Sequence, residues 1–279
     1  MASLYKTAAA VCLMALCGLR AEAAGQTTYK FRPLKVDDAA YFAANLVRNG
    51  KLPVHVSEVA RDDNIVSTLN EKVVQDEIVK QTEEANEDTC EELIETLSLK
   101  EIFHLSFDYT DSPNYRELLQ KALDAGLQVF NQISALHLCC VVLTCLSFFK
   151  RKEYPSQWGD IWEVEAGANL AYLLGSNSTK IGCVIGECVT VASGGEKALP
   201  SDETSTGKAA LFCKLSPEVE KGSAPFDEEY FTGLVSRTAK LTEMAEEDLK
   251  APSNDGTAAA ALPTILAAIL VAMLTALSA

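Results

Sequence analysis

The sequence predicts an α+β fold in which a small antiparallel sheet packs against helices. Two apolar stretches, residues 180–191 and 209–217, flank a run rich in Gly, Ser, Pro and Asp. This is the pattern of two antiparallel strands joined by a long exposed loop. Helical spacing of apolar residues recurs on both sides of this hairpin, beginning with residues 36–49. Together the two patterns place the chain in the α+β class.

Both ends of the 279-residue chain resemble processing signals rather than parts of a folded domain. Lys6 precedes an apolar run at residues 7–19, and Ala-Glu-Ala at 21–23 provides a small-x-small cleavage pattern. We therefore expect residues 1–23 to be a secretory signal peptide. A membrane anchor is disfavoured because the run is shorter than the roughly 20 residues that a spanning helix needs.

The other end has the order that a GPI transamidase recognises, namely small residues, a short spacer and an apolar tail. Residues 251–257 form the small-residue stem, in which Ser253 and Asn254 are the expected attachment site. Residues 258–279 carry no charge and are expected to be removed as the hydrophobic GPI signal. The alternative is a tail-anchored helix, and both interpretations place the protein on a membrane.

Residues 24–250 are expected to form one extracellular domain, which is long enough for a single well-filled core. The chain has 39 acidic and 24 basic residues, so its net charge is −15. Such a surface repels phosphate backbones, which argues against nucleic acid as a partner. It also argues against a domain that lies directly on anionic lipid. Contact with the membrane is therefore expected through the GPI lipid.

In a secreted protein most cysteines are expected to be oxidised. Cys12 and Cys17 belong to the expected signal peptide, which leaves an odd number of the 9 cysteines in the mature chain. We expect three disulfides and one buried free thiol. The chain has no C-x-x-C spacing, and His55, His104 and His137 are scattered, so no zinc site and no cofactor are expected.

Three cysteines lie on the two strands of the hairpin. Cys183 on the first strand and Cys213 on the second can form a disulfide if their Cα atoms lie about 5.5 Å apart, a distance that adjacent strands allow. Cys188 is an odd number of residues from Cys183, so in a regular strand it points to the other face of the sheet. It needs a partner elsewhere, and Cys90 is the only cysteine early in the mature chain.

Short motifs resemble the CAP (pathogenesis-related-1-like) superfamily. The main ones are Ile-Gly-Cys at 181–183, the cysteine at 188 and Cys-x-x-x-Pro at 213–217. Asn-x-x-Arg-x-Gly-x-x-Pro at 45–53 resembles that superfamily's first helix, and Trp-x-x-Glu at 162–165 resembles its central helix. The overall layout is most similar to the GPI-anchored surface antigens (SAG family) of Eimeria coccidian parasites.

That resemblance implies an αβα sandwich with a CAP-like topology, in which a small antiparallel sheet is flanked by helices. It also implies that Cys90 pairs with Cys188, beside the hairpin bridge of Cys183 with Cys213. The first of these bridges would join a helix to the sheet.

The chain departs from the superfamily where its cleft chemistry would lie. Ala44 and Asn169 stand at two positions where CAP proteins place histidines. Without those imidazoles, Glu163 and Glu165 have neither a metal to bind nor a base to pair with. We therefore expect no catalytic and no metal site. The alternatives are a CAP-type lipid or sterol carrier and a degenerate CAP enzyme-like site.

Residues 138–149 are almost entirely apolar, but the segment is too short to span a bilayer and so belongs to the core. Its β-branched and aromatic content favours the central strand of the sheet over a buried helix. Cys139, Cys140 and Cys145 are left for the third bridge, yet neither strand nor helix spacing lets them meet. A bend in the segment, or a pairing of one of them with Cys90, stays open.

Two amphipathic helices are expected between the first helix and this apolar segment. One starts near Asp62 and runs toward Leu93, either continuous or broken in two. Its acidic run at 83–92 lacks the spacing and the glycine of a calcium loop, so a solvated helix face is expected. The other helix starts with Ser112 as the N-cap and Pro113 as its first residue.

Two more helices surround the hairpin. Residues 154–174 have helical apolar spacing with two tryptophans, which is more typical of a core than of a ligand platform. Residues 225–249 are expected to form a last helix that covers the sheet. Just before the hairpin, Asn177 begins the one N-glycosylation sequon of the chain and is the candidate glycosylation site.

These features together predict a non-catalytic, GPI-anchored surface antigen on the outer leaflet of a parasite plasma membrane. The sequence has no nucleotide-binding glycine motif and no Gly-x-Ser-x-Gly elbow. The expected partner is a host-cell surface molecule, and the expected roles are host-cell attachment and exposure to immunity.

Overall fold

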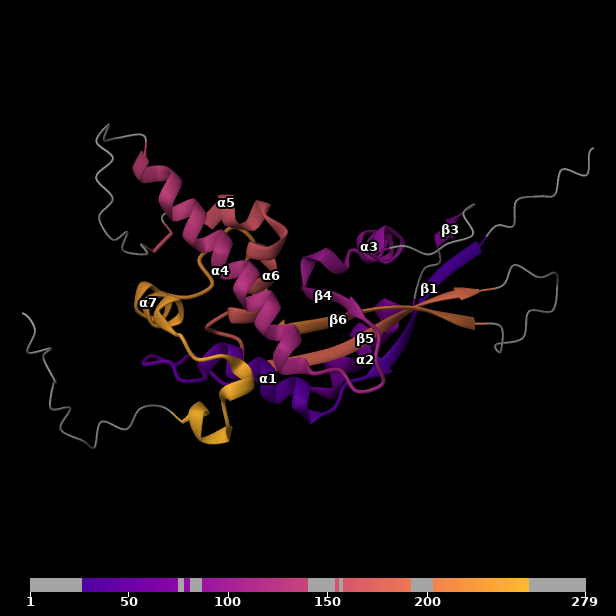
Figure 1. Ribbon diagram of the computed structural model, residues 1–279, viewed down its shortest axis with the longest axis horizontal. Coiled ribbons are helices and arrows are strands. Elements are labelled where there is room, and N and C mark those ends of the chain that lie inside the picture. Colours follow the sequence, from indigo (N-terminus) through magenta and orange to yellow (C-terminus); the bar gives the residue numbers. More distant parts are fainter. Residues whose placement is uncertain are drawn as a thin grey trace, which may run out of the picture.

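The computed structural model describes residues 27–74, 78–80, 87–139, 154–155, 158–191 and 203–250. Its architecture is α+β, as expected, with one sheet between two layers of helices (Figure 1). The expected signal peptide, stem and GPI signal lie outside the described residues, and so do Ser253 and Asn254. Among the helices that are described, none is long and apolar enough to cross a membrane.

The strands form one sheet in the order β3-β1-β5-β6-β4, and β2 pairs with the beginning of β5. All neighbours are antiparallel except β2 and β5. β5 therefore lies at the centre and β4 at one edge. The strands are β1 (Thr27–Lys35), β2 (Ala60–Arg61), β3 (Ile78–Lys80), β4 (Phe103–Asp108), β5 (Lys180–Val191) and β6 (Glu203–Ser216).

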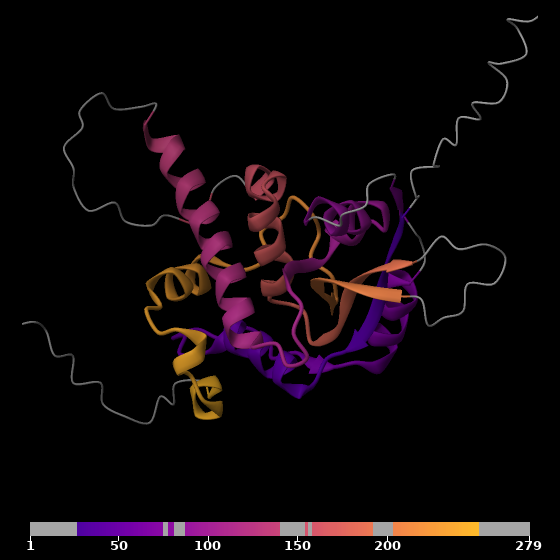
Figure 2. The same ribbon diagram turned by 45° about the vertical axis from the view of Figure 1, so that its right-hand side comes forward.

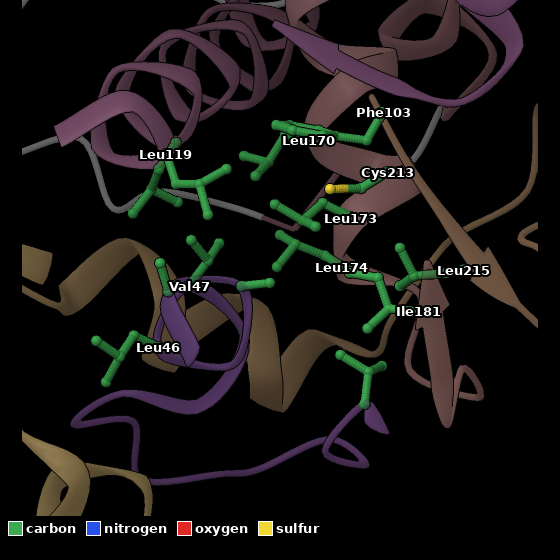
Figure 3. Packing of buried hydrophobic residues seen from close by; sticks show 14 of the residues in the cluster. Leu46, Val47, Phe103, Leu119, Leu170, Leu173, Leu174, Ile181, Cys213 and Leu215 are labelled. Atoms are coloured by element: carbon green, nitrogen blue, oxygen red, sulfur yellow. The ribbon is translucent and has the colours of Figure 1, made fainter. Parts of the chain in front are cut away.

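Helices cover both faces of the sheet, and each face has its own hydrophobic core. The larger core contains Leu119 and Leu170 and packs under α1, α4, α5, α6 and α7 (Figure 3). The smaller core contains Phe31 and Leu93 and packs under α2 and α3. Figure 2 shows α4 and α7 together, on the side of the molecule away from α3. The helices are α1 (Asp38–Asn49), α2 (Asp63–Val73), α3 (Glu87–Thr96), α4 (Tyr115–Cys139), α5 (Trp158–Glu163), α6 (Glu165–Leu174) and α7 (Glu228–Ser236), with short 3-10 turns η1 (Leu99–Glu101), η2 (Leu241–Glu243) and η3 (Glu246–Leu249).

The predicted hairpin is formed by β5 and β6, the two longest strands. β5 has the expected bounds, whereas β6 begins at Glu203, before the expected residue 209. The added residues are rich in Thr, Ser and Gly, which favour turns. They pair with the end of β5 beyond a register shift between Cys188 and Val189, so tertiary pairing overrides their local preference.

The 45–53 motif holds the loop that follows α1. The side-chain amide of Asn45 donates to Val59 O and accepts from Val59 N, both at 2.9 Å. Arg48 is fully buried, and burial lowers its pKa to about 10. Its guanidinium donates to four backbone carbonyl oxygens, those of Ser57, Leu173, Gly175 and Ser178. The motif therefore has a structural role, because it joins α1 to the turn between α6 and β5.

Two expected elements differ in the structure. For the segment from Asp62 toward Leu93 the broken alternative is confirmed, because α2 and α3 are separate helices, but strand β3 between them was not expected. The strand expected at 138–149 is wrong at its beginning, because α4 continues through Cys139, while residues 140–149 lie outside the described part of the chain. α4 packs so closely on α6 that any side chain at Gly126 would clash with Leu170. Extending this helix is easier than forming a new strand.

Smaller differences concern helix ends. α4 begins after Asn114, whose carbonyl accepts from Leu118 N at 3.0 Å, so Ser112 is not the N-cap. The helix expected over 154–174 is broken at Val164 into α5 and α6. Both tryptophans are buried in the larger core, as expected. The helix expected over 225–249 is α7 followed by η2 and η3.

Candidate functional site

Among the residues that the structure describes there are two disulfides, and they join the two expected cysteine pairs. Cys183 and Cys213 are directly opposed in the hairpin, with Cα atoms 4.2 Å apart, and belong to the larger core. Cys90 and Cys188 join α3 to β5, with Cα atoms 6.1 Å apart, and belong to the smaller core. The odd spacing of Cys183 and Cys188 thus places the two bridges on opposite faces of the sheet.

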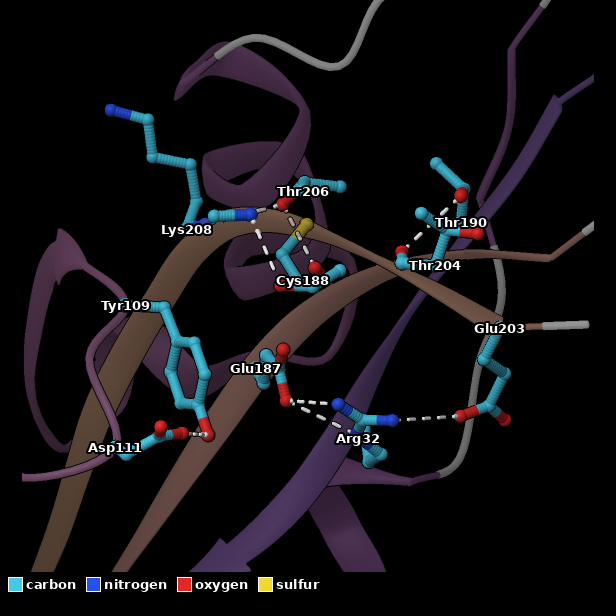
Figure 4. Close-up of polar contacts among 12 residues, drawn as sticks. Arg32, Tyr109, Asp111, Glu187, Cys188, Thr190, Glu203, Thr204, Thr206 and Lys208 are labelled. Carbon is cyan, nitrogen blue, oxygen red and sulfur yellow. Dashed lines mark hydrogen bonds and ion pairs between the residues drawn. The ribbon is translucent and has the colours of Figure 1, made fainter. Parts of the chain in front are cut away.

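A charged cluster joins β1 to the hairpin (Figure 4). Glu187 on β5 is fully buried, and its Oε2 accepts from Arg32 Nη2 at 2.6 Å. This hydrogen bond raises the pKa of Arg32, and the carboxylate of Glu203 lies 3.9 Å from the same guanidinium. The nearby Tyr109 hydroxyl donates to Asp111 at 3.3 Å, and burial raises the pKa of Tyr109. These contacts fix β1, β5 and β6 relative to one another.

The candidate glycosylation site lies in the turn between α6 and β5. Asn177 is exposed there. Ser178 of the same sequon is 1% exposed, and its hydroxyl donates to Pro217 O at 2.6 Å. The asparagine is accessible while the rest of the sequon is held by the fold. Glycosylation of Asn177 stays a prediction.

Two adjoining hollows lie along the edge strand β4. The larger, about 710 Å³, lies between β4 and the beginnings of α3 and α4. The smaller, about 350 Å³, lies between β4, α4 and α6. The two hollows share four of their lining residues, namely Glu91, Leu105, Ser106 and Lys121. Together they form one depression along the strand, here named the β4 groove.

His104 on β4 is the most buried polar residue of the groove wall. It is 5% exposed, and its backbone N–H donates to Asn169 Oδ1 at 2.9 Å. Its ring Nδ1 lies 3.0 Å from Ile102 O, and its Nε2 lies 3.3 Å from Glu165 Oε1. Both ring nitrogens face oxygen atoms, so only the doubly protonated ring donates to both. Glu165 and Asn169 thereby connect α6 to the beginning of β4.

Sequence spacing identified only part of this site. Glu165 and Asn169 line the smaller hollow, whereas Glu163 is exposed at the end of α5. Ala44 is buried in the larger core and does not line either hollow. The two positions where CAP proteins place histidines therefore do not meet in this groove. His104 gives no signal in the sequence, because only the pairing of β4 and its contact with α6 bring it to Glu165.

The groove has few groups placed for nucleophilic or metal chemistry in the described residues. Within the described ranges, no Ser, Thr or Cys side chain hydrogen-bonds the His104 ring. In the same part of the chain, no three His, Cys, Asp or Glu side chains are grouped so that they could hold a metal ion. Beside the groove, a hydrogen bond from Lys208 at 2.8 Å lowers the pKa of Asp108. The arrangement is suited to binding through polar and backbone groups.

Comparison with known proteins adds little to this description. The crystal structure of a hookworm platelet inhibitor is similar to this chain with a TM-score of 0.34 and 13% sequence identity, over 70% of this chain and 79% of that one. A TM-score this low does not establish a shared fold. No protein-family model matches the chain, and no curated protein matches it in sequence. Its class is therefore defined by its own structure, as an αβα protein with one disulfide on each face of the sheet.

Proposed function

We propose that this chain is a GPI-anchored surface antigen of the kind found in Eimeria parasites, which displays one αβα domain for attachment to host cells. The observation that carries the proposal is the pair of buried disulfides, one on each face of the sheet. Disulfides of this kind persist in secreted and cell-surface proteins and are rare in the cytosol. They agree with the secretory signal expected at residues 1–23.

The anchor is supported by the sequence after the domain. The described fold extends to Lys250, and the small-residue stem at 251–257 follows directly. Ser253 and Asn254 provide the small residues that the transamidase requires, ahead of the uncharged segment 258–279. The domain would thus be held on the outer leaflet by a lipid.

A binding role is favoured over catalysis. The groove beside β4 pairs the buried imidazole of His104 with the exposed carboxylate of Glu165, and this contact joins α6 to the sheet. The candidate catalytic residues of the CAP resemblance are replaced at Ala44 and Asn169, and only the second position reaches the groove. We propose a host-cell surface molecule as the partner and no cofactor.

The anchor is tested on intact cells that express the full chain. Phosphatidylinositol-specific phospholipase C is expected to release the protein into the medium. A variant with Ser253→Gln and Asn254→Gln is expected to lose surface display, because the transamidase needs small residues at its site. The control Lys250→Gln makes the same replacement just ahead of the stem and should leave release unchanged. Protein that stays on the cells after complete enzyme treatment would contradict the proposal.

A further inference from the structure

β4 has an outer side on which backbone groups are free. Figure 1 shows this strand at the margin of the sheet, next to β6 and between α6 and α3. Just beyond β4, Tyr109 N donates to Gly207 O, so every second residue before it also bonds toward β6. The residues between them, Ser106 and Asp108, direct their N–H and C=O groups away from the sheet.

His104 is the last residue of this edge whose outward N–H has a hydrogen-bond partner in the described ranges. Its outward N–H is bound by Asn169 Oδ1, but the outward groups of Ser106 and Asp108 have no hydrogen-bond partner in the described ranges. Ser106 and Asp108 are also exposed. An unpaired edge of this kind is a template for another strand unless the protein covers it. The edge available for pairing therefore begins directly after His104.

The larger hollow of the β4 groove follows the same edge. It is lined by four consecutive strand residues, 105–108. Consecutive side chains point to opposite faces of a sheet, so a hollow that touches all four lies along the backbone edge and not over one face. Leu118 and Pro113 near the start of α4 form an apolar wall, and Glu91 of α3 lies across from them. The hollow's volume of about 710 Å³ is sufficient for several residues of extended chain.

The charges around the groove favour a basic occupant. Glu91 on α3 and Glu117 on α4 are exposed carboxylates on its two walls, and neither has an ion pair in the described part of the chain. Asp108 is already paired with Lys208 at 2.8 Å, and Lys121 is the other cation in the lining, so the larger hollow has three acidic and two basic side chains. The net charge of −15 adds long-range attraction for cationic partners.

We propose that the β4 edge binds an extended peptide of a partner protein, rich in Lys or Arg, which adds a strand beside Ser106 and Asp108. Backbone hydrogen bonds would supply the affinity, and Glu91 and Glu117 would select basic side chains. The inference deepens the proposed function, on which it rests for its biological setting, by naming the surface used for attachment. The test of peptide binding uses purified protein and does not depend on the anchor. Peptide binding can therefore fail while the anchor is present, and peptide can bind even if the anchor is absent.

The probe is a fluorescent peptide of alternating Lys and Val, about six residues long, which is a usual strand length. It is titrated into the full, disulfide-bonded chain in detergent. One matched peptide carries N-methyl groups on two consecutive central residues, so that neither of its edges offers a complete set of N–H donors. Another replaces every Lys by Asp. We expect the parent peptide to bind roughly tenfold or more tightly than either control, because each lost backbone hydrogen bond weakens binding.

Amide hydrogen exchange locates the binding. Bound peptide is expected to slow exchange at Ser106 and Asp108 roughly tenfold or more, because their outward N–H groups gain partners. Exchange at Leu105 and Phe107, which already bond toward β6, should not change.

Substitutions in the groove provide the second readout. Ser106→Pro removes one outward N–H and leaves the bonds to β6 in place, and proline is tolerated on edge strands. It should weaken peptide binding roughly tenfold, whereas the control Ser106→Thr should bind normally. Glu91→Gln with Glu117→Gln should reduce the preference for the Lys peptide over the Asp peptide. If Ser106→Pro does not fold, the N-methylated peptide and the exchange data on the unaltered protein decide the matter.

Three results would overturn the proposal. The first is no measurable binding of the parent peptide. The second is equal binding of the N-methylated peptide, which would show that the backbone edge is not used. The third is a dimer in which Ser106 and Asp108 are protected before peptide is added, because β4 would then pair with a second copy of the chain.

Discussion

Asn169 connects a helix to a sheet edge through one hydrogen bond. Its Oδ1 accepts from the backbone N–H of His104, a residue that is 5% exposed. Without Asn169 that N–H would have no partner in a place where water has little access, and such a loss costs more than a surface hydrogen bond contributes. The side chain therefore both stabilises the contact of α6 with β4 and limits how much of the edge is open.

We predict that Asn169→Ala lowers the free energy of unfolding by about 1–3 kcal/mol, the usual cost of an unsatisfied buried donor. Asn169→Asp keeps an oxygen acceptor at the same position and should cost less. Urea unfolding of both variants measures the difference, and amide exchange at His104 should become faster only in the alanine variant. An alanine variant as stable as the parent would show that the hydrogen bond has no net value.

For single residues, the sequence predicted the face of the sheet to which a strand side chain points. The opposite faces of Cys183 and Cys188 follow from their odd spacing in a strand, and the structure has them in different cores. The contact of His104 with Glu165 and Asn169 could not be predicted, because it joins residues that are 61 and 65 positions apart. Nothing in the residue types fixes which strand edge lies beside which helix.

Among the elements, α3 depends most clearly on a covalent link. It has 10 residues, and helices this short are marginal in isolation. Leu93 and Ile94 pack it on the smaller core, and Cys90 near its beginning is joined to Cys188 in the centre of the sheet. The disulfide thereby fixes the wall of the β4 groove that carries Glu91.

We predict that Cys90→Ala destabilises the protein more than Cys213→Ala. The Cys90–Cys188 bridge closes a separation of 98 residues and the hairpin bridge one of 30. On a chain-entropy model the longer loop contributes about 4.7 kcal/mol, roughly 1 kcal/mol more than the shorter one. Denaturant unfolding measures both losses. The paired variants Cys90→Ala with Cys188→Ala, and Cys183→Ala with Cys213→Ala, control for the thiol left behind, and an inverted order would contradict the loop argument.

Elements with a strong local pattern were predicted, and those set by packing were not. α1 follows from the helical spacing of its apolar residues, and the hairpin follows from two apolar stretches that flank a run of turn residues. β3 was missed, because three residues pair with β1 inside a longer helical pattern. The expected strand at 138–149 was favoured by composition, yet α4 extends to Cys139 because its earlier turns pack on α6 around Gly126. Such packing is not encoded in local composition.

Several tyrosines of the molecule are buried in the larger core. Tyr115 and Tyr230 are 5% and 1% exposed, and burial raises the pKa of both hydroxyls, that of Tyr115 to about 12. The Tyr230 hydroxyl donates to Arg48 O at 2.6 Å. Folded protein therefore keeps protons that unfolded tyrosines lose above their ordinary pKa of 10.

We predict that stability falls as the pH rises above 10. A raised pKa gives stability that is complete below the unfolded value of 10 and is lost as the pH passes toward about 12 for Tyr115. Arg48 acts in the opposite sense, since its pKa is lowered to about 10, so the contribution of Tyr115 is obtained by comparing the parent with Tyr115→Phe. Thermal unfolding from pH 8 to 11 measures the slope. Tyr115→Phe should make the slope shallower, and an unchanged slope would contradict this assignment.

The most direct test is peptide mapping of the non-reduced protein taken from the surface of intact cells. We propose that a folded αβα domain is displayed there, and in the described residues each face of its sheet has one disulfide. We predict peptides in which Cys90 is joined to Cys188 and Cys183 to Cys213. Finding Cys90 joined to Cys139, Cys140 or Cys145, or finding these four cysteines reduced, would contradict this prediction.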